Sequence, residues 1–201
     1  MHKNILNNHQ KDLFPLLEKF SSNFYLAGGT AIALQIGHRK SIDFDLFSEK
    51  KIDSSKLKNN SSLEIQEVLV EEENELTVII NKTKITFLHY PFAVKAEVEL
   101  ENKIKMPSLI SLAAMKAYTL GRRSELKDYI DLYFLLKEKF SLEEIEKKAS
   151  GIFGNLFSAK LFRVQLVYFK DLDFDTEVEV LDDFSFMKMK KFFENIVSSG
   201  Q

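Results

Sequence analysis

The chain has 201 residues, of which 45% are hydrophobic, so it is long and apolar enough to build a buried core. Its 28 basic and 30 acidic residues give a formal net charge of −2, which excludes a global positive field for binding nucleic acid. The chain has no cysteine, which excludes disulfides and thiolate metal sites.

The sequence gives no sign of a membrane or secretory segment. No stretch approaches the roughly 20 apolar residues that a membrane-spanning helix needs. The first residues, Met1 to Ile5, lack the apolar core of a signal peptide. We therefore expect a cytoplasmic protein that does not bind a membrane.

The first predicted element is an amphipathic helix over residues 9–20. Leu13, Leu17 and Phe20 recur at helical spacing, so one face of this helix should pack on the core.

The stretch from residue 24 to residue 47 predicts a strand, a glycine turn, a helix and a second strand. The turn is Gly28, Gly29 and Thr30, and the helical pattern then runs to Ile36 and ends at Gly37. Adjacent glycines let the backbone approach an anion closely. The free N–H groups of the helix start, with Thr30 as a hydroxyl donor, suit a phosphate.

The second of these strands carries Asp43 and Asp45. Because they are two residues apart, both carboxylates should leave one face of the strand, while Ile42, Phe44 and Leu46 leave the other. Two such close carboxylates repel each other unless a cation lies between them. Oxygen ligands suit Mg²⁺, which is usually bound by one or two carboxylates together with substrate phosphates. The pattern therefore indicates nucleotidyl or phosphoryl transfer.

Further strands are predicted between residues 48 and 106, after a short helix at 54–58. Alternating patterns at 63–68, 76–80 and 84–88 predict antiparallel strands that complete a mixed sheet. We interpret the acidic run at 71–73 as a solvated strand end.

The second half of the chain predicts helices only. A helix capped by Ser108 should run to Leu120, and others are expected at 124–137, 142–149, 158–170 and 184–197. Lys116 lies in the apolar stripe of the first helix, and spacing alone favours a lysine whose ammonium reaches water. In the second helix Asp128 and Asp131 share a face, and Lys127 can pair with Asp131.

These motifs, taken together, resemble the nucleotidyltransferase-superfamily domain of the AbiEii/AbiGii toxin type. The resemblance begins with Gly-Gly-Thr at 28–30 and His-Arg-Lys-Ser at 38–41, followed by Asp43 and Asp45. It continues with Leu-Ala-Ala-Met-Lys at 112–116 and with the block at 127–136, and it covers about residues 22–136.

The resemblance implies an α+β fold, with a nucleotidyltransferase-like core and mixed β-sheet at 1–106. A helical C-terminal subdomain at 107–201 is expected to complete the active-site cleft. The implied site has a triphosphate on the glycine turn and Mg²⁺ on the aspartate pair. Two basic residues clamp the phosphates and two acidic residues position or deprotonate the acceptor; the full set is Gly28, Gly29, Thr30, Arg39, Asp43, Asp45, Lys116, Asp128 and Asp131.

The implied activity is Mg²⁺-dependent transfer of a nucleoside monophosphate from a nucleoside triphosphate to a hydroxyl of RNA or protein. The family resemblance also implies a toxin that works with a separately encoded antitoxin.

The sequence departs from the wider superfamily at Thr86. Nucleotidyltransferases of this fold commonly carry a third carboxylate on the strand next to the aspartate pair, but the strand at 84–90 has no acidic residue. A hydroxyl is not a base near neutral pH unless it is activated. Our preferred hypothesis is that Asp128 supplies the carboxylate; a contribution from His89 and an incomplete catalytic set are the alternatives.

Three other functions fit the same residues. A nucleotide-binding pseudoenzyme would bind a triphosphate without releasing pyrophosphate. A protein-interaction module would bind an antitoxin or a second subunit through its helical half without needing Asp43 and Asp45. A phosphotransferase would deliver the γ-phosphate from the same turn.

Overall fold

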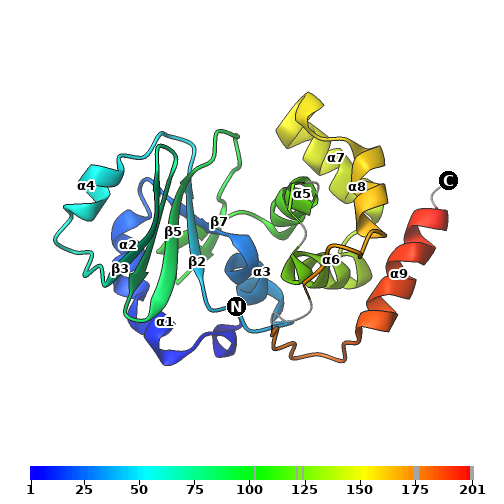
Figure 1. The fold of residues 1–201 in the computed structure, drawn as a ribbon, viewed down its shortest axis with the longest axis horizontal. Helices are drawn as coiled ribbons and strands as arrows, with labels where there is room; N and C mark the ends of the chain where they lie inside the picture. Colours follow the sequence, from blue (N-terminus) through cyan, green and yellow to red (C-terminus); the bar gives the residue numbers. More distant parts are fainter. Residues whose placement is uncertain (102, 121, 124, 174–176, 200–201) are drawn as a thin grey trace. The chain divides into compact units, whose positions relative to one another are not determined.

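The computed structural model describes residues 1–101, 103–120, 122–123, 125–173 and 177–199. The chain divides into two compact units, Met1–Ser108 and Leu109–Gln201 (Figure 1). The first contains all the strands of the described residues and the second contains helices. No helix within the described ranges is long and apolar enough to cross a membrane.

The first unit is built on a five-stranded sheet with the strand order β1-β2-β5-β4-β3. Strands β2 and β5 are parallel, whereas the other neighbouring pairs are antiparallel, so the predicted mixed sheet is confirmed. The strands are β1 (Tyr25–Ala27), β2 (Phe44–Ser48), β3 (Glu67–Glu72), β4 (Glu75–Ile80) and β5 (Thr83–His89).

Short helices and a separate strand pair complete this unit. The pair β6 and β7 is antiparallel and forms its own two-stranded sheet. The bounds are η1 (Lys3–Ile5), α1 (Asn8–Asp12), α2 (Phe14–Phe20), α3 (Gly28–Ile36), α4 (Ser54–Lys58), β6 (Val98–Leu100) and β7 (Ile104–Met106).

The single helix predicted at 9–20 is two helices in the structure. Asn7 caps α1, with its side chain accepting from the backbone N–H of Gln10. Pro15 lies in the first turn of α2, where its missing N–H costs nothing, whereas in a continuous helix it would break the hydrogen-bond ladder. The predicted strand at 63–68 was also too early, because β3 begins at Glu67.

Alternation along β2 and β5 separates an apolar face from a polar face. Phe44 and Phe87 are buried, and they meet Phe14 and Phe20 of α2 at ring-centroid distances of 6.4 and 5.2 Å. Ile42 was expected to join this apolar face, but it is 66% exposed, because the strand begins only at Phe44.

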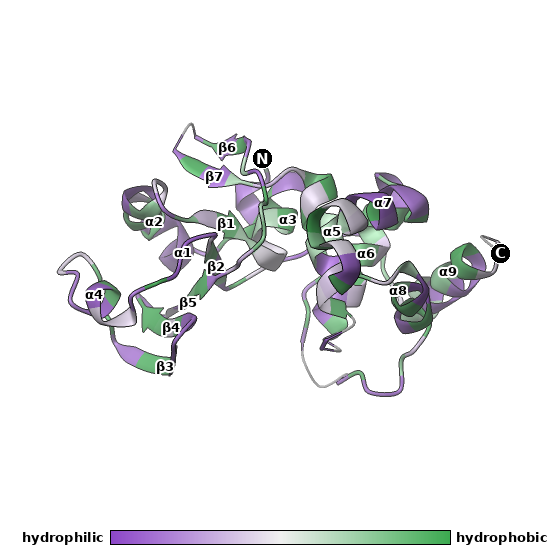
Figure 2. Cartoon of the chain, turned by 90° about the horizontal axis from the view of Figure 1, so that it is seen from above, coloured by the Kyte–Doolittle hydropathy of each residue, from purple (hydrophilic) through white to green (hydrophobic). Residues whose placement is uncertain are grey.

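The second unit consists of helices with amphipathic sequences, and Figure 2 shows both hydrophobic and hydrophilic residues along α7 and α9. Ser141 and Ser158 cap α7 and α8 as their side chains accept backbone N–H groups. Helix α8 ends earlier than predicted, and Ser124, the expected start of α6, lies outside the described residues. The bounds are α5 (Leu109–Leu120), α6 (Leu126–Glu138), α7 (Leu142–Phe153), η2 (Gly154–Leu156), α8 (Ala159–Leu166) and α9 (Phe186–Ser199).

Candidate functional site

The glycine turn joins β1 directly to the start of α3. Ala27 ends the strand in an extended conformation and Gly28 begins the helix with a φ of 65°. At the other end, Gly37 closes α3 in the left-handed conformation, as its position after the apolar pattern predicted. The predicted order of strand, glycine turn, helix and strand is therefore confirmed.

The hydroxyl of Thr30 points into the protein and supports the aspartate segment. Thr30 is buried, and its hydroxyl donates to the backbone carbonyl of Asp43. Since that hydroxyl has a single hydrogen, the 2.7 Å contact between Thr30 Oγ1 and Ser41 Oγ requires Ser41 to donate. We had expected the Thr30 hydroxyl to bind a phosphate, but in this arrangement it holds Asp43 in place.

Gln10 also belongs to this network, although the sequence did not predict it. Gln10 is fully buried, and its side-chain Nε2 donates to the Ser41 carbonyl at 2.8 Å. The only sequence signal was a glutamine on the inner side of an amphipathic helix. Gln10 and Thr30 thus tether the segment that leads into β2 at two points.

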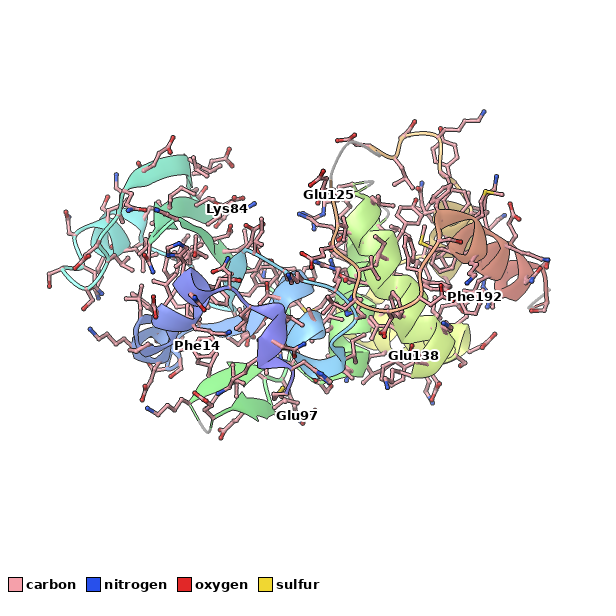
Figure 3. The ribbon with its side chains drawn as sticks, turned by 90° about the horizontal axis from the view of Figure 1, so that it is seen from below. Phe14, Lys84, Glu97, Glu125, Glu138 and Phe192 are labelled. Carbon is pink, nitrogen blue, oxygen red and sulfur yellow. The ribbon has the colours of Figure 1, made fainter. Side chains whose placement is uncertain are left out.

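Asp43 lies one residue before β2 and Asp45 is the second residue of that strand, and both side chains are partly exposed. Asp43 Oδ2 is 2.9 Å from the ammonium of Lys84, which is labelled in Figure 3. The parallel register begins with Phe44 opposite Ile85, so the preceding residues Asp43 and Lys84 are neighbours by position. Sequence reasoning missed Lys84, although it lies two residues before Thr86 on the same face.

The donor set at β2 fits a hard divalent cation. Two carboxylates supply hard oxygen ligands, and the described residues contain no group of three or more His, Cys, Asp or Glu side chains that could hold a metal without further ligands. Mg²⁺ is typically bound by one or two carboxylates with phosphates and waters completing its octahedron. Asp43 and Asp45 therefore fit Mg²⁺ that is bound together with a triphosphate. In this structure the Lys84 ammonium forms an ion pair with Asp43.

The strand register identifies the position at which the third carboxylate was expected. Asp45 lies opposite Thr86 on the parallel neighbour β5. The residue opposite Asp45 therefore carries a hydroxyl instead of a carboxylate, as the sequence predicted. His89 ends β5, where its ring nitrogen Nδ1 is 3.0 Å from Asn74 Oδ1 in an exposed contact.

Arg39 lies close to the aspartates in sequence, between α3 and β2. Its side chain is almost fully buried, and one guanidinium nitrogen donates to the Lys40 carbonyl at 2.9 Å. The phosphate contact expected of Arg39 stays a prediction.

In the helical unit, Lys116 forms a buried charge cluster with two aspartates. Lys116 Nζ is 2.5 Å from Asp128 Oδ1 and 2.8 Å from Asp131 Oδ2. Both aspartates are fully buried and Lys116 is 5% exposed, so the lysine does not extend its ammonium into water. The predicted pair of Lys127 with Asp131 is wrong, because Asp131 faces Lys116.

Arg123 adds a second cation to Asp128, with Nε donating to Oδ2 at 3.0 Å. Burial alone would raise the pKa of the Asp128 carboxyl, but the charges of Lys116 and Arg123 and their hydrogen bonds together lower it. Asp128 is therefore held as a carboxylate. A carboxylate with a lowered pKa is a weak base, so the cluster is better suited to fixing the Lys116 ammonium than to accepting a proton.

The predicted site residues thus form two clusters, one in each unit. The first unit brings together the glycine turn, Thr30, the aspartate pair and Thr86. The second unit brings together Lys116, Asp128 and Asp131, with Arg123 as an addition.

Comparisons with known proteins identify the relatives of this chain. A family model described as "Nucleotidyl transferase AbiEii toxin, Type IV TA system" matches residues 13–101. Protein aq_aa25 of Aquifex aeolicus is 31% identical in an alignment over 186 residues that covers 87% of this chain and 90% of that protein.

Two solved structures share the fold. MenT4, the nucleotidyltransferase toxin Rv2826c of Mycobacterium tuberculosis, has a TM-score of 0.60 at 13% identity over 96% of this chain and 85% of its own. JHP933 of Helicobacter pylori has a TM-score of 0.54 at 17% identity over 96% of this chain and 91% of its own. The expected nucleotidyltransferase-like fold, with a mixed sheet followed by helices, is confirmed.

Proposed function

The chain belongs to the AbiEii nucleotidyltransferase toxin family, and on that premise we propose that it transfers a nucleoside monophosphate from a nucleoside triphosphate to a hydroxyl of RNA or protein. One observation carries the proposal: Asp45, two residues after Asp43, pairs with Ala27, the residue that leads directly into the glycine turn. This pairing supports a phosphate-binding turn and a divalent-cation site in the same unit.

The glycine turn is the proposed binding site of the triphosphate. The first N–H groups of a helix have no partner within the helix, and the positive end of the helix dipole favours an anion. In α3 these groups belong to Gly28, Gly29 and Thr30 and to Ala31 after them. Thr30 thus contributes through its backbone, while its hydroxyl holds Asp43.

Asp43 and Asp45 are the proposed ligands of Mg²⁺. When bound, Mg²⁺ would neutralise negative charge on the α-phosphate. The oxygen of the acceptor hydroxyl forms a bond to the α-phosphorus, the bond to the leaving oxygen breaks, and pyrophosphate departs. The acceptor proton must go to a base, which Thr86 alone does not supply.

Lys116, with Arg39, is proposed to stabilise the charge of the phosphates. For Asp128 and Asp131 we favour a positioning role, because both hold the Lys116 ammonium and the pKa of Asp128 is lowered. The ion pairs of Asp128 with Lys116 and Arg123 argue against the role of the missing base, which the sequence suggests for this residue.

The proposed biological setting is a toxin paired with a separately encoded antitoxin in the cytoplasm. The family description supports this setting, because it names a toxin of a type IV toxin–antitoxin system.

The test is a labelling experiment with purified protein and Mg²⁺. Each nucleoside triphosphate, carrying radioactive phosphorus at the α position, is incubated with total RNA or with lysate protein. We expect label on one acceptor class, loss of label in Asp43→Ala/Asp45→Ala, and no loss in the control Glu64→Ala, which changes an exposed residue of the same unit. Label that persists in the double variant would contradict the proposal.

A second candidate is the nucleotide-binding pseudoenzyme, which the absence of an acidic residue at Thr86 favours. It predicts that the protein binds the triphosphate and that binding weakens in the double variant, while no pyrophosphate is released. Triphosphate labelled at the γ position distinguishes a phosphotransferase, which would place that label on the acceptor.

A further inference from the structure

A line of hydrogen bonds crosses the sheet from Thr86 to an acidic side chain on the next strand. Thr86 Oγ1 lies 3.1 Å from Thr77 Oγ1, and Thr77 Oγ1 donates to Glu75 Oε1 at 2.8 Å. The strand register explains this line, because Thr86 pairs with Thr77 on β4 and with Asp45 on β2. Glu75 lies two residues before Thr77, so both side chains leave the same face of β4.

The direction of the hydrogen bonds follows from the donor inventory. An ionised carboxylate can only accept, so Thr77 gives its single hydroxyl hydrogen to Glu75. Thr86 must then donate its own hydrogen to Thr77. The lone pairs of Thr86 Oγ1 therefore stay available to accept a hydrogen bond on the side of β5 where Asp45 lies.

We propose that Glu75 is the terminal proton acceptor of the transfer reaction, reached through the hydroxyls of Thr86 and Thr77. This inference rests on the proposed nucleotidyl transfer. As the acceptor oxygen bonds to the α-phosphorus, its proton passes to Thr86 Oγ1, the Thr86 proton passes to Thr77 Oγ1, and the Thr77 proton passes to Glu75. Both threonines end the step neutral, the carboxylate becomes a carboxylic acid, and pyrophosphate carries away the electron pair of the broken bond.

The surroundings of the three residues favour this assignment over Asp128. Asp128 is held by two cations, whereas Glu75 forms no ion pair with any residue that the structure describes. Thr77 is 4% exposed, so the middle of the relay is shielded from water, while Glu75 is partly exposed and can return its proton to solvent. Other nucleotidyltransferases of this fold commonly carry a carboxylate at the position of Thr86 on β5. In this protein Glu75 on the neighbouring strand β4 would take its role.

The first experiment measures single-turnover transfer and nucleotide affinity separately. Glu75→Gln and Thr77→Val interrupt the relay, and we expect each to slow transfer by about 10²-fold or more, as loss of a general base does. Nucleotide affinity should stay at the parental value, because neither residue belongs to the triphosphate site. Glu72→Gln removes the carboxylate opposite Glu75 on β3 and should transfer at the parental rate. Thr77→Ser keeps the hydroxyl and should transfer faster than Thr77→Val.

A rescue experiment distinguishes a proton relay from a structural network. Thr86→Asp in the Glu75→Gln background puts a carboxylate at the start of the relay and should restore most of the rate. A solvent isotope measurement should show several protons in motion in the parent and one in the rescued variant.

The outcomes separate the two proposals. A parent that transfers no label with any triphosphate would end the proposed function and this inference with it. A parental rate in Glu75→Gln, or a joint loss of rate and nucleotide affinity, would overturn the relay alone and leave nucleotidyl transfer standing.

Discussion

A Cβ atom added to Gly28 would lie 1.9 Å from Oδ2 of Asp45, far inside van der Waals contact. Gly28 also has a φ of 65°, a conformation that side-chain-bearing residues rarely adopt. The turn and the carboxylate are therefore packed directly against each other. A glycine is required here both for its backbone angle and for the space that it leaves to Asp45.

Gly28→Ala should displace the Asp45 carboxylate and abolish most transfer. The strained backbone conformation should also destabilise the protein by about 1–3 kcal/mol. Gly151→Ala is the matched control, because nothing lies within 4 Å of its added Cβ within α7. It should stabilise the protein by about 0.5–1 kcal/mol. Denaturant unfolding and label transfer measure both effects, and full activity of Gly28→Ala would refute the packing argument.

Thr30→Val should release the segment that carries Asp43. The variant leaves the Asp43 carbonyl and the Ser41 hydroxyl without their buried partner, which costs about 1–3 kcal/mol. Thr30→Ser keeps the hydroxyl and should retain most of the stability. The test compares the unfolding free energies of Thr30→Val and Thr30→Ser. Equal values would show that the Thr30 hydroxyl does not hold the segment that carries Asp43.

Lys84→Met should tighten the binding of a divalent cation. The ammonium of Lys84 lies 2.9 Å from Asp43 Oδ2 and competes with a metal ion for that carboxylate. Titration with Mn²⁺ as a magnetic probe measures the affinity without any enzymatic activity. Lys82→Met changes an exposed lysine of the β4–β5 turn and serves as the control. Weaker Mn²⁺ binding in Lys84→Met would mean that Lys84 orients Asp43 rather than competing for it.

Lys116→Met should destabilise the helical unit strongly. It removes the cation between two fully buried aspartates, and breaking a buried ion pair in this way typically costs about 3–5 kcal/mol. Lys127→Met removes a partly exposed lysine that pairs with Glu125 at 2.9 Å, and its effect should stay within about 0.5 kcal/mol. Thermal unfolding of the two variants provides the test. Similar losses of stability in the two variants would show that the buried ion pairs of Lys116 stabilise the protein no more than the partly exposed pair of Lys127.

Asp128 should make the stability of the protein depend on acid pH. Its pKa is lowered in the folded state, chiefly because Lys116 and Arg123 outweigh the opposing effect of burial. Its contribution is therefore complete above the ordinary aspartate pKa of about 4, and it is lost as pH falls through the lower folded value. Unfolding free energy measured against pH should fall less steeply in Asp128→Asn than in the parent. Parallel curves for the two proteins would contradict this linkage.

The local features of the site could be read from the sequence. Gly28 and Gly37 act through backbone angles that few other residues adopt, so their positions predicted the turn and the helix end. Asp43 and Asp45 were recognisable because spacing by two fixes a strand face. The position of Thr86 followed from the strand pattern and is confirmed by its register with Asp45.

The tertiary partners could not be read in the same way. Spacing alone favoured a Lys116 ammonium in water, because it does not reveal that Asp128 and Asp131 on the next helix face it; only the family resemblance assigned Lys116 to the site. Lys84 and Gln10 contact residues that are distant in sequence, and such pairings depend on the sheet register and on helix packing. The break between α1 and α2 is different, because Pro15 was a visible local signal for it.

The parallel pairing of β2 with β5 has a consequence for the order of folding. Strands β3, β4 and β5 form antiparallel pairs between neighbours in sequence. Strand β2 pairs with β5, which comes after β3 and β4 in the chain. Contacts between distant segments pay a larger loop-closure entropy and generally form late. During synthesis the aspartates leave the ribosome before Thr86 does, so a nascent chain carries the cation ligands without their neighbouring strand. Asp45 would then gain Thr86 as its neighbour only when the β4–β5 hairpin has docked on β2.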